Sequence, residues 1–338
     1  MVQNLKVYDE SRQWPRFLNN MKNQDKEIVY VIGHKNPDTD SVSSAIAYAE
    51  FLCRTNINAK AVICGNINKE TKYFMDKYNL QVPDLLETAK GKKFVLVDHC
   101  SYLQAMDNMK NNEVIGIIDH HEKGDIVTDD IPYIKIENVG ATVTLIYQIY
   151  KENNIEISKD IARVMLMGII SDTKNLKKHN VTDYDRQAFK ELLNISEIKD
   201  DIDELFKDMT NALSDYEGMS DLEIFESDYK EYSFKGYKYG ISIINTKDEK
   251  TKIDLAERMY KVMIDNHKKF NVDFLFAKIS NSTEKNMYMV AYDDKSKEIL
   301  NKAFNNYDGY KFFVFNESLS RKQILVPAIN DVIDKNYR

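Results

Sequence analysis

Short runs of consecutive apolar residues recur in the first 200 positions of the chain. The segments "IVYVI" (28–32), "FVLV" (94–97) and "VIGII" (114–118) each end abruptly in glycine, acidic or imidazole residues. Continuous runs of Val and Ile of this length are typical of strands that are buried on both faces of a parallel sheet. We therefore expect these three segments to be neighbouring strands of one sheet.

Helical patterns lie between and after these runs. Val42, Ala45, Ile46 and Ala49 recur with the i, i+3, i+4, i+7 spacing of one helix face, and residues 161–169 repeat it. Strands that alternate with helices predict an α/β domain, in which ligands bind beyond the carboxyl ends of the strands.

The pattern changes after about residue 210. The stretch 211–218 is polar and ends in Gly218, which predicts a linker between a first domain, 1–210 with an N-terminal extension 1–26, and a second, 219–338. The second domain should be a smaller α/β unit. Its expected elements are two strands around Gly236, an amphipathic helix over 252–270, and strands at 274–280, 287–292 and 312–315.

Composition narrows the class of protein. A chain of 338 residues is long for one core, and 43% apolar residues exclude wholesale disorder. The net charge of −7 argues against a surface that coats nucleic acid. The three cysteines form no C-x-x-C pair, which indicates a reducing compartment. No apolar run reaches ~18 residues and the start lacks a signal-peptide core, so we expect a cytoplasmic protein without a membrane partner.

Groups with lone pairs cluster where the apolar elements end. Five carboxylates and three imidazoles do so: His34, Asp38, Asp40, Asp98, Asp119, His120, His121 and Asp172. A simpler explanation is available for some of them, since Asp40 or Ser41 could cap a helix that begins near Val42. One cap satisfies only one or two amides, however, which leaves His34 and Asp38 unexplained.

The same groups have the chemistry of a metal site. Asp172 lies at the negative end of a helix dipole, which is unfavourable for an anion unless a cation compensates it. Mixed His and Asp ligands suit Mn²⁺, Co²⁺ or Zn²⁺ better than Ca²⁺. The set is too large for one open catalytic metal, and paired metals that share a carboxylate recur in enzymes that attack phosphorus in line.

The motifs "GHKNPDTDS", "VDH", "DHH" and "SRK...VP" resemble those of the manganese-dependent (family II) inorganic pyrophosphatases of the DHH phosphoesterase superfamily. The likeness runs in order from about Ile28 to Ala328, and the first motif together with DHH is specific. The resemblance implies an α/β fold with a mainly parallel-sheet DHH domain and a smaller DHHA2-type domain. It also implies an active site in the cleft between them, completed when the domains close about the linker.

The resemblance further implies two Mn²⁺ ions, with Co²⁺ or Mg²⁺ as alternatives and additional Mg²⁺ arriving with the substrate. One ion would be held by His34, Asp38, Asp98 and Asp172. The other would be held by Asp40, Asp98, His120 and Asp172, so that Asp98 and Asp172 bridge. His121 would face the substrate phosphate, and Asp119 would orient the imidazoles.

The phosphate binders implied by the resemblance are basic. They are Arg321 and Lys322 in "SLSRKQILVP" and Lys230 in "DYKEYSF". Without the resemblance, "SRK" would be interpreted as an exposed basic turn. Gln323 replaces the second lysine of the family's usual S-R-K-K, which leaves phosphate affinity and substrate choice open.

The sequence thus predicts an enzyme that hydrolyses inorganic pyrophosphate to two phosphates with a hydroxide activated by two metals. His121, Lys230, Arg321 and Lys322 would be its catalytic residues, stabilising negative charge. The alternatives are an exopolyphosphatase-like or other small-phosphoester hydrolase, and a catalytically dead module that binds a phosphate ligand. We expect pyrophosphate as partner, no nucleic acid, and a homodimer.

Overall fold

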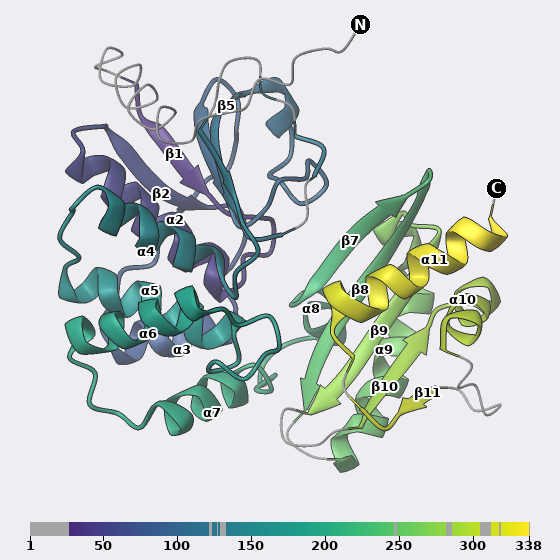
Figure 1. Ribbon diagram of the computed structural model, residues 1–338. Helices are drawn as coiled ribbons and strands as arrows, with labels where there is room; N and C mark the ends of the chain where they lie inside the picture. The colour runs from purple at the N-terminus through teal and green to yellow at the C-terminus, as the bar shows by residue number, and fades with distance from the viewer. Residues whose placement is uncertain are drawn as a thin grey trace, which may run out of the picture. The chain divides into compact units, whose positions relative to one another are not determined.

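The computed structural model describes residues 27–121, 124–126, 128, 133–246, 249–281, 286–304, 312–317 and 319–337 (Figure 1). The predicted N-terminal extension, 1–26, lies outside the described residues. The chain divides into two compact units, Met1–Met209 and Thr210–Arg338, and each is described by itself.

The first unit is built on a six-stranded sheet with the strand order β3-β2-β1-β4-β5-β6. All five strand pairings in its described part are parallel, which confirms the predicted sheet class. Its strands are β1 (Val29–Ile32), β2 (Ala59–Ile63), β3 (Asp84–Leu85), β4 (Lys93–Val97), β5 (Glu113–Asp119) and β6 (Tyr133–Ile136).

The central strands are buried on both faces, as their apolar runs predicted. In β4, Val95 and Val97 belong to one buried cluster, whereas Phe94 and Leu96 belong to another. The alternation follows from the two-residue period of a strand, which sends successive side chains to opposite faces. A strand with two buried faces must be apolar at nearly every position, which is why it appears as an unbroken run.

The helices of the first unit are α2 (Thr39–Arg54), α3 (Lys69–Lys77), α4 (Thr142–Glu152), α5 (Lys159–Asp172), α6 (Asp183–Ser196) and α7 (Ile202–Ala212), with a short 3₁₀ turn η1 (Met109–Asn111). Helices α2 and α5 pack closely at Gly168, where an added Cβ would lie 2.9 Å from Cβ of Ser43 and 3.0 Å from Oδ1 of Asp40. The missing side chain therefore allows α5 to approach the start of α2.

The start of α2 differs from the sequence expectation. The helix begins at Thr39 rather than near Val42, and its N-cap is Asp38, whose Oδ1 accepts the backbone N–H of Ser41 at 3.1 Å. The prediction that Asp40 or Ser41 caps the helix is therefore wrong. One extra helical turn moves Asp40 into the first turn, where its side chain is buried.

The second unit is a five-stranded mixed sheet with the order β11-β10-β9-β8-β7. Its strands are β7 (Tyr229–Phe234), β8 (Tyr237–Thr246), β9 (Phe274–Asn281), β10 (Met287–Ala291) and β11 (Phe313–Phe315). In the part of this sheet that the structure describes, only β8 and β9 pair in parallel. The β7–β8 hairpin turns at Lys235 and Gly236, both with positive φ, a conformation that matches the strand twist.

Helices cover both faces of this sheet. They are α8 (Asp221–Glu226), α9 (Glu249–Phe270), α10 (Asp294–Phe304) and α11 (Val326–Asn336), with a π-helical turn η2 (Arg321–Leu325) before α11. Phe274 and Phe276 of β9 pack with apolar residues of α10 and α11, while Leu275 and Ala277 pack with those of α8 and α9. In the described ranges, no helix is both long and apolar enough to cross a membrane.

Candidate metal centre

Strands β1, β4 and β5 are neighbours in the sheet, so their carboxyl ends lie side by side. The residues that follow them bring His34, Asp98 and His120 to one edge, as the sequence predicted. Asp98 has φ 60°, a left-handed conformation that aspartate adopts more readily than most residues.

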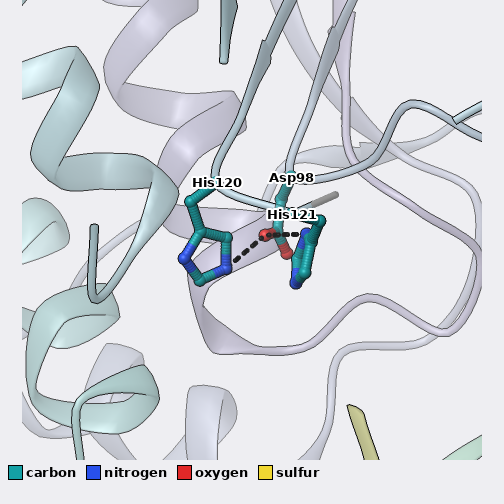
Figure 2. Close-up of side chains that lie close together, drawn as sticks. All are labelled: Asp98, His120 and His121. Carbon is teal, nitrogen blue, oxygen red and sulfur yellow. Dashed lines mark ion pairs between the residues drawn. The ribbon is translucent and has the colours of Figure 1, made fainter. Parts of the chain in front are cut away.

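Nε2 of His120 and the carboxylate of Asp98 face each other (Figure 2). Nδ1 of His120 lies 3.0 Å from the carbonyl oxygen of Val139, and a carbonyl can only accept, so Nδ1 carries the proton of the neutral ring. Nε2 is then a lone pair, 3.6 Å from Oδ1 of Asp98 and 3.2 Å from Oδ2 of Asp172. Nε2 of His120 and Oδ2 of Asp98 are buried without a hydrogen-bond partner.

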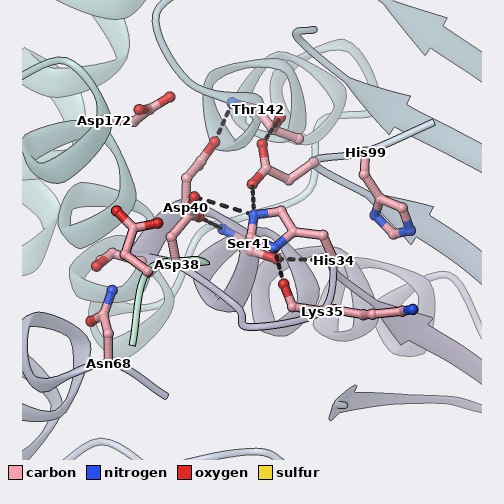
Figure 3. Close-up of polar contacts among 12 residues, drawn as sticks. His34, Lys35, Asp38, Asp40, Ser41, Asn68, His99, Thr142 and Asp172 are labelled. Carbon is pink, nitrogen blue, oxygen red and sulfur yellow. Dashed lines mark hydrogen bonds and ion pairs between the residues drawn. The ribbon is translucent and has the colours of Figure 1, made fainter. Parts of the chain in front are cut away.

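His34 repeats this arrangement on the other side of Asp98. Its Nδ1 lies 2.7 Å from the carbonyl oxygen of Lys35, so in the neutral ring Nε2 is the lone pair (Figure 3). Nε2 lies 3.2 Å from Oδ2 of Asp38 and 3.4 Å from Oδ2 of Asp98. Acceptors that converge without a proton repel each other, and a cation between them removes that repulsion. The donors therefore fit a bound metal.

Asp40 is held by the start of α4. Its Oδ2 accepts the backbone N–H of Thr142 at 2.6 Å and its Oδ1 that of Val143 at 3.2 Å (Figure 3). These amides lie at the positive end of the helix dipole and favour the carboxylate. Burial nevertheless raises the pKa of Asp40 well above its ordinary value, and the charges of Asp98 and Asp172 add to the shift.

Among the residues that the structure describes, three groups of side chains could each hold an ion, with the ligand atoms of each group all within 4.8 Å of one another. They are His34, Asp38 and Asp98; Asp40, His120 and Asp172; and Asp98, His120 and His121. Each of the first two groups contains three of the four ligands expected for its metal. Asp98 is shared between groups, whereas Asp172 belongs to one of them. The mixed nitrogen and oxygen donors suit Mn²⁺ and related transition metals.

His121 is oriented differently from His120. Its Nδ1 lies 2.7 Å from Oδ1 of Asp119, and its backbone N–H donates to the same oxygen at 3.1 Å. Burial acts to raise the pKa of Asp119, but the hydrogen bond from His121 holds that pKa below its usual value. Because Nδ1 is committed to Asp119, it is poorly suited to bind a metal.

Two contributors to the site were missed in the sequence. Lys178 donates to Oδ1 of Asp172 at 2.8 Å, so the compensating cation that the helix end required is present. Glu70 is buried and accepts hydroxyl hydrogen bonds from Thr39 at 2.8 Å and Ser171 at 2.6 Å. Burial raises the pKa of Glu70 despite these bonds. Both residues stand in charged stretches of the sequence, which are typical of solvated helix faces.

Two of the predicted phosphate binders, Lys230 and Arg321, come together in the second unit. Lys230 of β7 and Arg321 at the start of η2 are each 7% exposed. Arg321 donates to Oδ1 of Asp228 at 2.6 Å and to the carbonyl oxygen of Ile241, which pairs with Lys230 in the β7–β8 register. The interpretation of "SRK" as an exposed turn is therefore wrong for Arg321. Lys322 is partly exposed.

The fold and this cluster define a DHH-type protein. The DHH family, N-terminal domain, matches residues 28–169, and the DHHA2 domain matches residues 207–332. The manganese-dependent inorganic pyrophosphatase of Bacillus subtilis (strain 168) is 33% identical over 313 residues, covering 91% of this chain and 99% of that protein. That of Methanocaldococcus jannaschii is 33% identical over 307 residues, covering 88% and 97%. The chain belongs to the manganese-dependent inorganic pyrophosphatase family, as the motifs implied.

Solved structures also match the fold of this chain. A Methanococcus jannaschii crystal structure assigned to the family II inorganic pyrophosphatases superposes with a TM-score of 0.81 at 32% identity, covering 90% of this chain and 99% of that one. An exopolyphosphatase-related protein from Bacteroides fragilis superposes with a TM-score of 0.50 at 15% identity, covering 98% and 97%, and shares the fold alone.

Proposed function

We propose that this protein is an inorganic diphosphatase that hydrolyses pyrophosphate to two phosphates. The observation that carries the proposal is the pair of lone-pair clusters on either side of Asp98, one with His34 and the other with His120. The names of the relatives support pyrophosphate over longer polyphosphates or other phosphoesters, and the complete set of donors argues against a dead binding module.

Two Mn²⁺ ions fit the donors. His34, Asp38 and Asp98 would hold one, and Asp40, His120 and Asp172 would hold the other together with Asp98. The assignment of Asp172 as a second bridge stays a prediction. When bound, such ions polarise phosphoryl oxygens and lower the pKa of water. The side chains supply the rest: the N–H groups of α4 and the carbonyls of Lys35 and Val139 fix the direction of the ligand atoms before any ion arrives.

His121 would act on the substrate. Asp119 fixes the tautomer in which Nδ1 carries the proton, and it stabilises the imidazolium that forms if Nε2 takes up a second proton. His121 can therefore donate a hydrogen bond or a proton from Nε2 to a phosphate oxygen as negative charge grows there.

Lys230, Arg321 and Lys322 would bind the phosphates of the substrate. Asp228 and the carbonyl of Ile241 fix the guanidinium of Arg321, which reduces the conformational entropy lost when it binds a phosphate. In this proposal residues 1–210 form the metal-binding catalytic domain and 219–338 the substrate-binding domain. A homodimer, a cytoplasmic location and the absence of nucleic-acid partners stay predictions from the sequence.

The test is a phosphate-release assay with pyrophosphate, tripolyphosphate and a nucleoside triphosphate, each in Mn²⁺ and in Mg²⁺. We expect pyrophosphate to have the highest kcat/KM by at least roughly tenfold, which corresponds to about 1.4 kcal/mol of transition-state discrimination. A higher kcat/KM for tripolyphosphate or the nucleotide would overturn the assignment of the substrate.

A further inference from the structure

At the end of α5, the carboxylate of Asp172 also binds the ammonium group of a lysine. Nζ of Lys178 lies 2.8 Å from Oδ1 of Asp172, while Oδ2 of the same carboxylate lies 3.2 Å from Nε2 of His120. The side chains of Lys178 and Asp172 are 27% and 29% exposed, so the pair lies at the rim of the cluster. An ammonium group thus contacts one of the proposed metal ligands directly.

An unusual backbone brings Lys178 to this place. Lys174, Asn175 and Leu176 have φ of 50°, 51° and 60°, and non-glycine residues rarely adopt the left-handed region in succession. The carbonyl of Thr173 accepts the backbone N–H groups of residues 177 and 178 at 3.0 Å each, so the turn closes on itself. The chain therefore returns to the helix end that it has just left. Backbone conformations of this cost persist where they place a functional group.

The preceding residue in the turn, Lys177, shows that the placement is selective. Nζ of Lys177 donates to Oδ1 of Asp203 in α7 at 2.6 Å, and the side chain of Asn175 donates to the same oxygen at 2.8 Å. Both partners of the Lys177 pair are mostly exposed, at 65% and 69%. Two consecutive lysines thus bind two different carboxylates, one on the surface and one in the metal cluster.

Cations that fill the cluster should weaken the Lys178–Asp172 pair. Like charges a few ångströms apart repel, so a bound divalent ion at Asp172 weakens the hold of that carboxylate on the ammonium. Lysine carries its charge on a flexible stem with three rotatable donors and can turn to another anion nearby. A diphosphate bound at this cluster brings such anions within reach.

We propose that Lys178 exchanges Asp172 for a phosphate oxygen of the bound diphosphate, which makes it a substrate-binding residue supplied by the metal-binding unit. This inference rests on the proposed function, because it takes an inorganic diphosphate as the ligand. Lys178 would act in addition to the basic residues of the second unit. It would raise the affinity for the diphosphate rather than the rate of bond cleavage.

Removing the ammonium group of Lys178 should change two binding affinities in opposite directions. Removing the ammonium should weaken diphosphate binding, since a charge-assisted contact is lost. It should also tighten the binding of Mn²⁺ to the metal-free protein, since Asp172 no longer pairs with a competing cation. A lysine that only maintained the turn would weaken both when replaced.

The experiment compares Lys178→Gln, Lys178→Arg and Lys177→Gln, the last as the matched surface control. Calorimetry measures Mn²⁺ binding to EDTA-treated protein and methylenediphosphonate binding to Mn²⁺-loaded protein, and a phosphate-release assay gives KM and kcat for pyrophosphate. For Lys178→Gln we expect about tenfold weaker binding of the analogue, about tenfold higher KM, kcat within about threefold of the wild type, and tighter Mn²⁺ binding. Lys178→Arg should restore the binding of the analogue. Lys177→Gln should match the wild type throughout.

Unchanged affinity for the analogue in Lys178→Gln, or weaker Mn²⁺ binding with a wild-type thermal transition, would overturn the proposal. If Lys178→Gln does not fold, Lys178→Met, which keeps the length of the stem, is measured in the same way and judged by the same outcomes. Failure of the wild-type protein to release phosphate from pyrophosphate would refute the proposed function instead. The two calorimetric titrations need no turnover and still decide the role of Lys178.

Discussion

The carboxylate of Asp40 accepts the backbone N–H of Thr142 at 2.6 Å, across 102 positions of sequence. The contact joins the first turn of α2 to the first turn of α4, so it ties a proposed metal ligand to the positive end of a helix. Even so, the pKa of Asp40 is raised, chiefly by burial. The site therefore stores an unfavourable charge that a metal ion would neutralise.

The raised pKa of Asp40 predicts how the free energy of unfolding of the metal-free protein changes with pH. A carboxyl whose pKa is higher in the folded state binds protons more tightly there, so the contribution of Asp40 to the free energy of unfolding is fully present only below the unfolded pKa of about 3.9. It falls as pH rises from there through the raised pKa of Asp40. Urea unfolding of EDTA-treated protein should show this loss as pH rises above about 4, the pKa of the unfolded carboxyl, and Asp40→Asn should reduce it. Asp265→Asn, at an exposed position of α9, is the control and should leave the pH dependence unchanged.

Asp98 is the ligand on which both ions are expected to depend, since it lies within reach of His34 and of His120. Asp98→Asn should lower the bound Mn²⁺ below two ions per chain and reduce kcat by several orders of magnitude. Metal analysis after dialysis, with a turnover assay, checks both. Asp107→Asn, which removes an exposed partner of Lys35, should change neither. Two tightly held ions and near-normal turnover in Asp98→Asn would show that the carboxylate does not bridge.

The adjacent histidines provide a matched pair of variants. Nε2 of His120 faces Asp172, whereas Nδ1 of His121 is committed to Asp119. His120→Gln should therefore lose a metal ion, and His121→Gln should keep both ions while its kcat falls by roughly a hundredfold or more, as expected for a lost acid or charge-stabilising group. Loss of an ion in His121→Gln would make that residue a ligand and contradict its assignment to the substrate.

Much of the fold and of the metal cluster could be predicted because the residue patterns that determine them are local in sequence. Each buried strand is one apolar run, and the ligands follow the runs directly, so the parallel order of β1, β4 and β5 is enough to bring His34, Asp98 and His120 together. The same logic could not give the start of α2, because Asp38, Asp40 and Ser41 all have side chains that can cap a helix.

Other parts depend on contacts that no short stretch of sequence reveals. Glu70 is buried, and its carboxylate accepts hydrogen bonds from Ser171, 101 positions away, and from Thr39. Lys178 reaches Asp172 only through a left-handed turn that has no glycine to indicate it. Arg321 is buried by its pairing with Asp228. A charged stretch has the same appearance in sequence whether its side chains meet solvent or a distant partner.

The neighbours Arg321 and Lys322 should respond differently to truncation, because Arg321 is buried in an ion pair with Asp228 whereas the side chain of Lys322 is partly exposed. Each substitution by Ala should remove a charge-assisted phosphate contact worth ~1.5–3 kcal/mol, or about one to two decades in kcat/KM. Arg321→Ala should in addition lower the thermal transition, since Asp228 loses its guanidinium partner. Lys322→Ala should leave the transition close to that of the wild type.

Asp228→Asn separates the two effects of Arg321. It keeps a side-chain acceptor for the guanidinium but removes the charge of the pair, so the thermal transition should fall by less than in Arg321→Ala. Because Arg321 keeps its bond to the carbonyl of Ile241, kcat/KM in Asp228→Asn should fall by less than tenfold. All three variants should retain both Mn²⁺ ions, because none of these residues belongs to the metal cluster. If Arg321→Ala keeps wild-type kcat/KM while its thermal transition falls, the guanidinium is structural and the phosphate-binding role passes to Lys230 and Lys322.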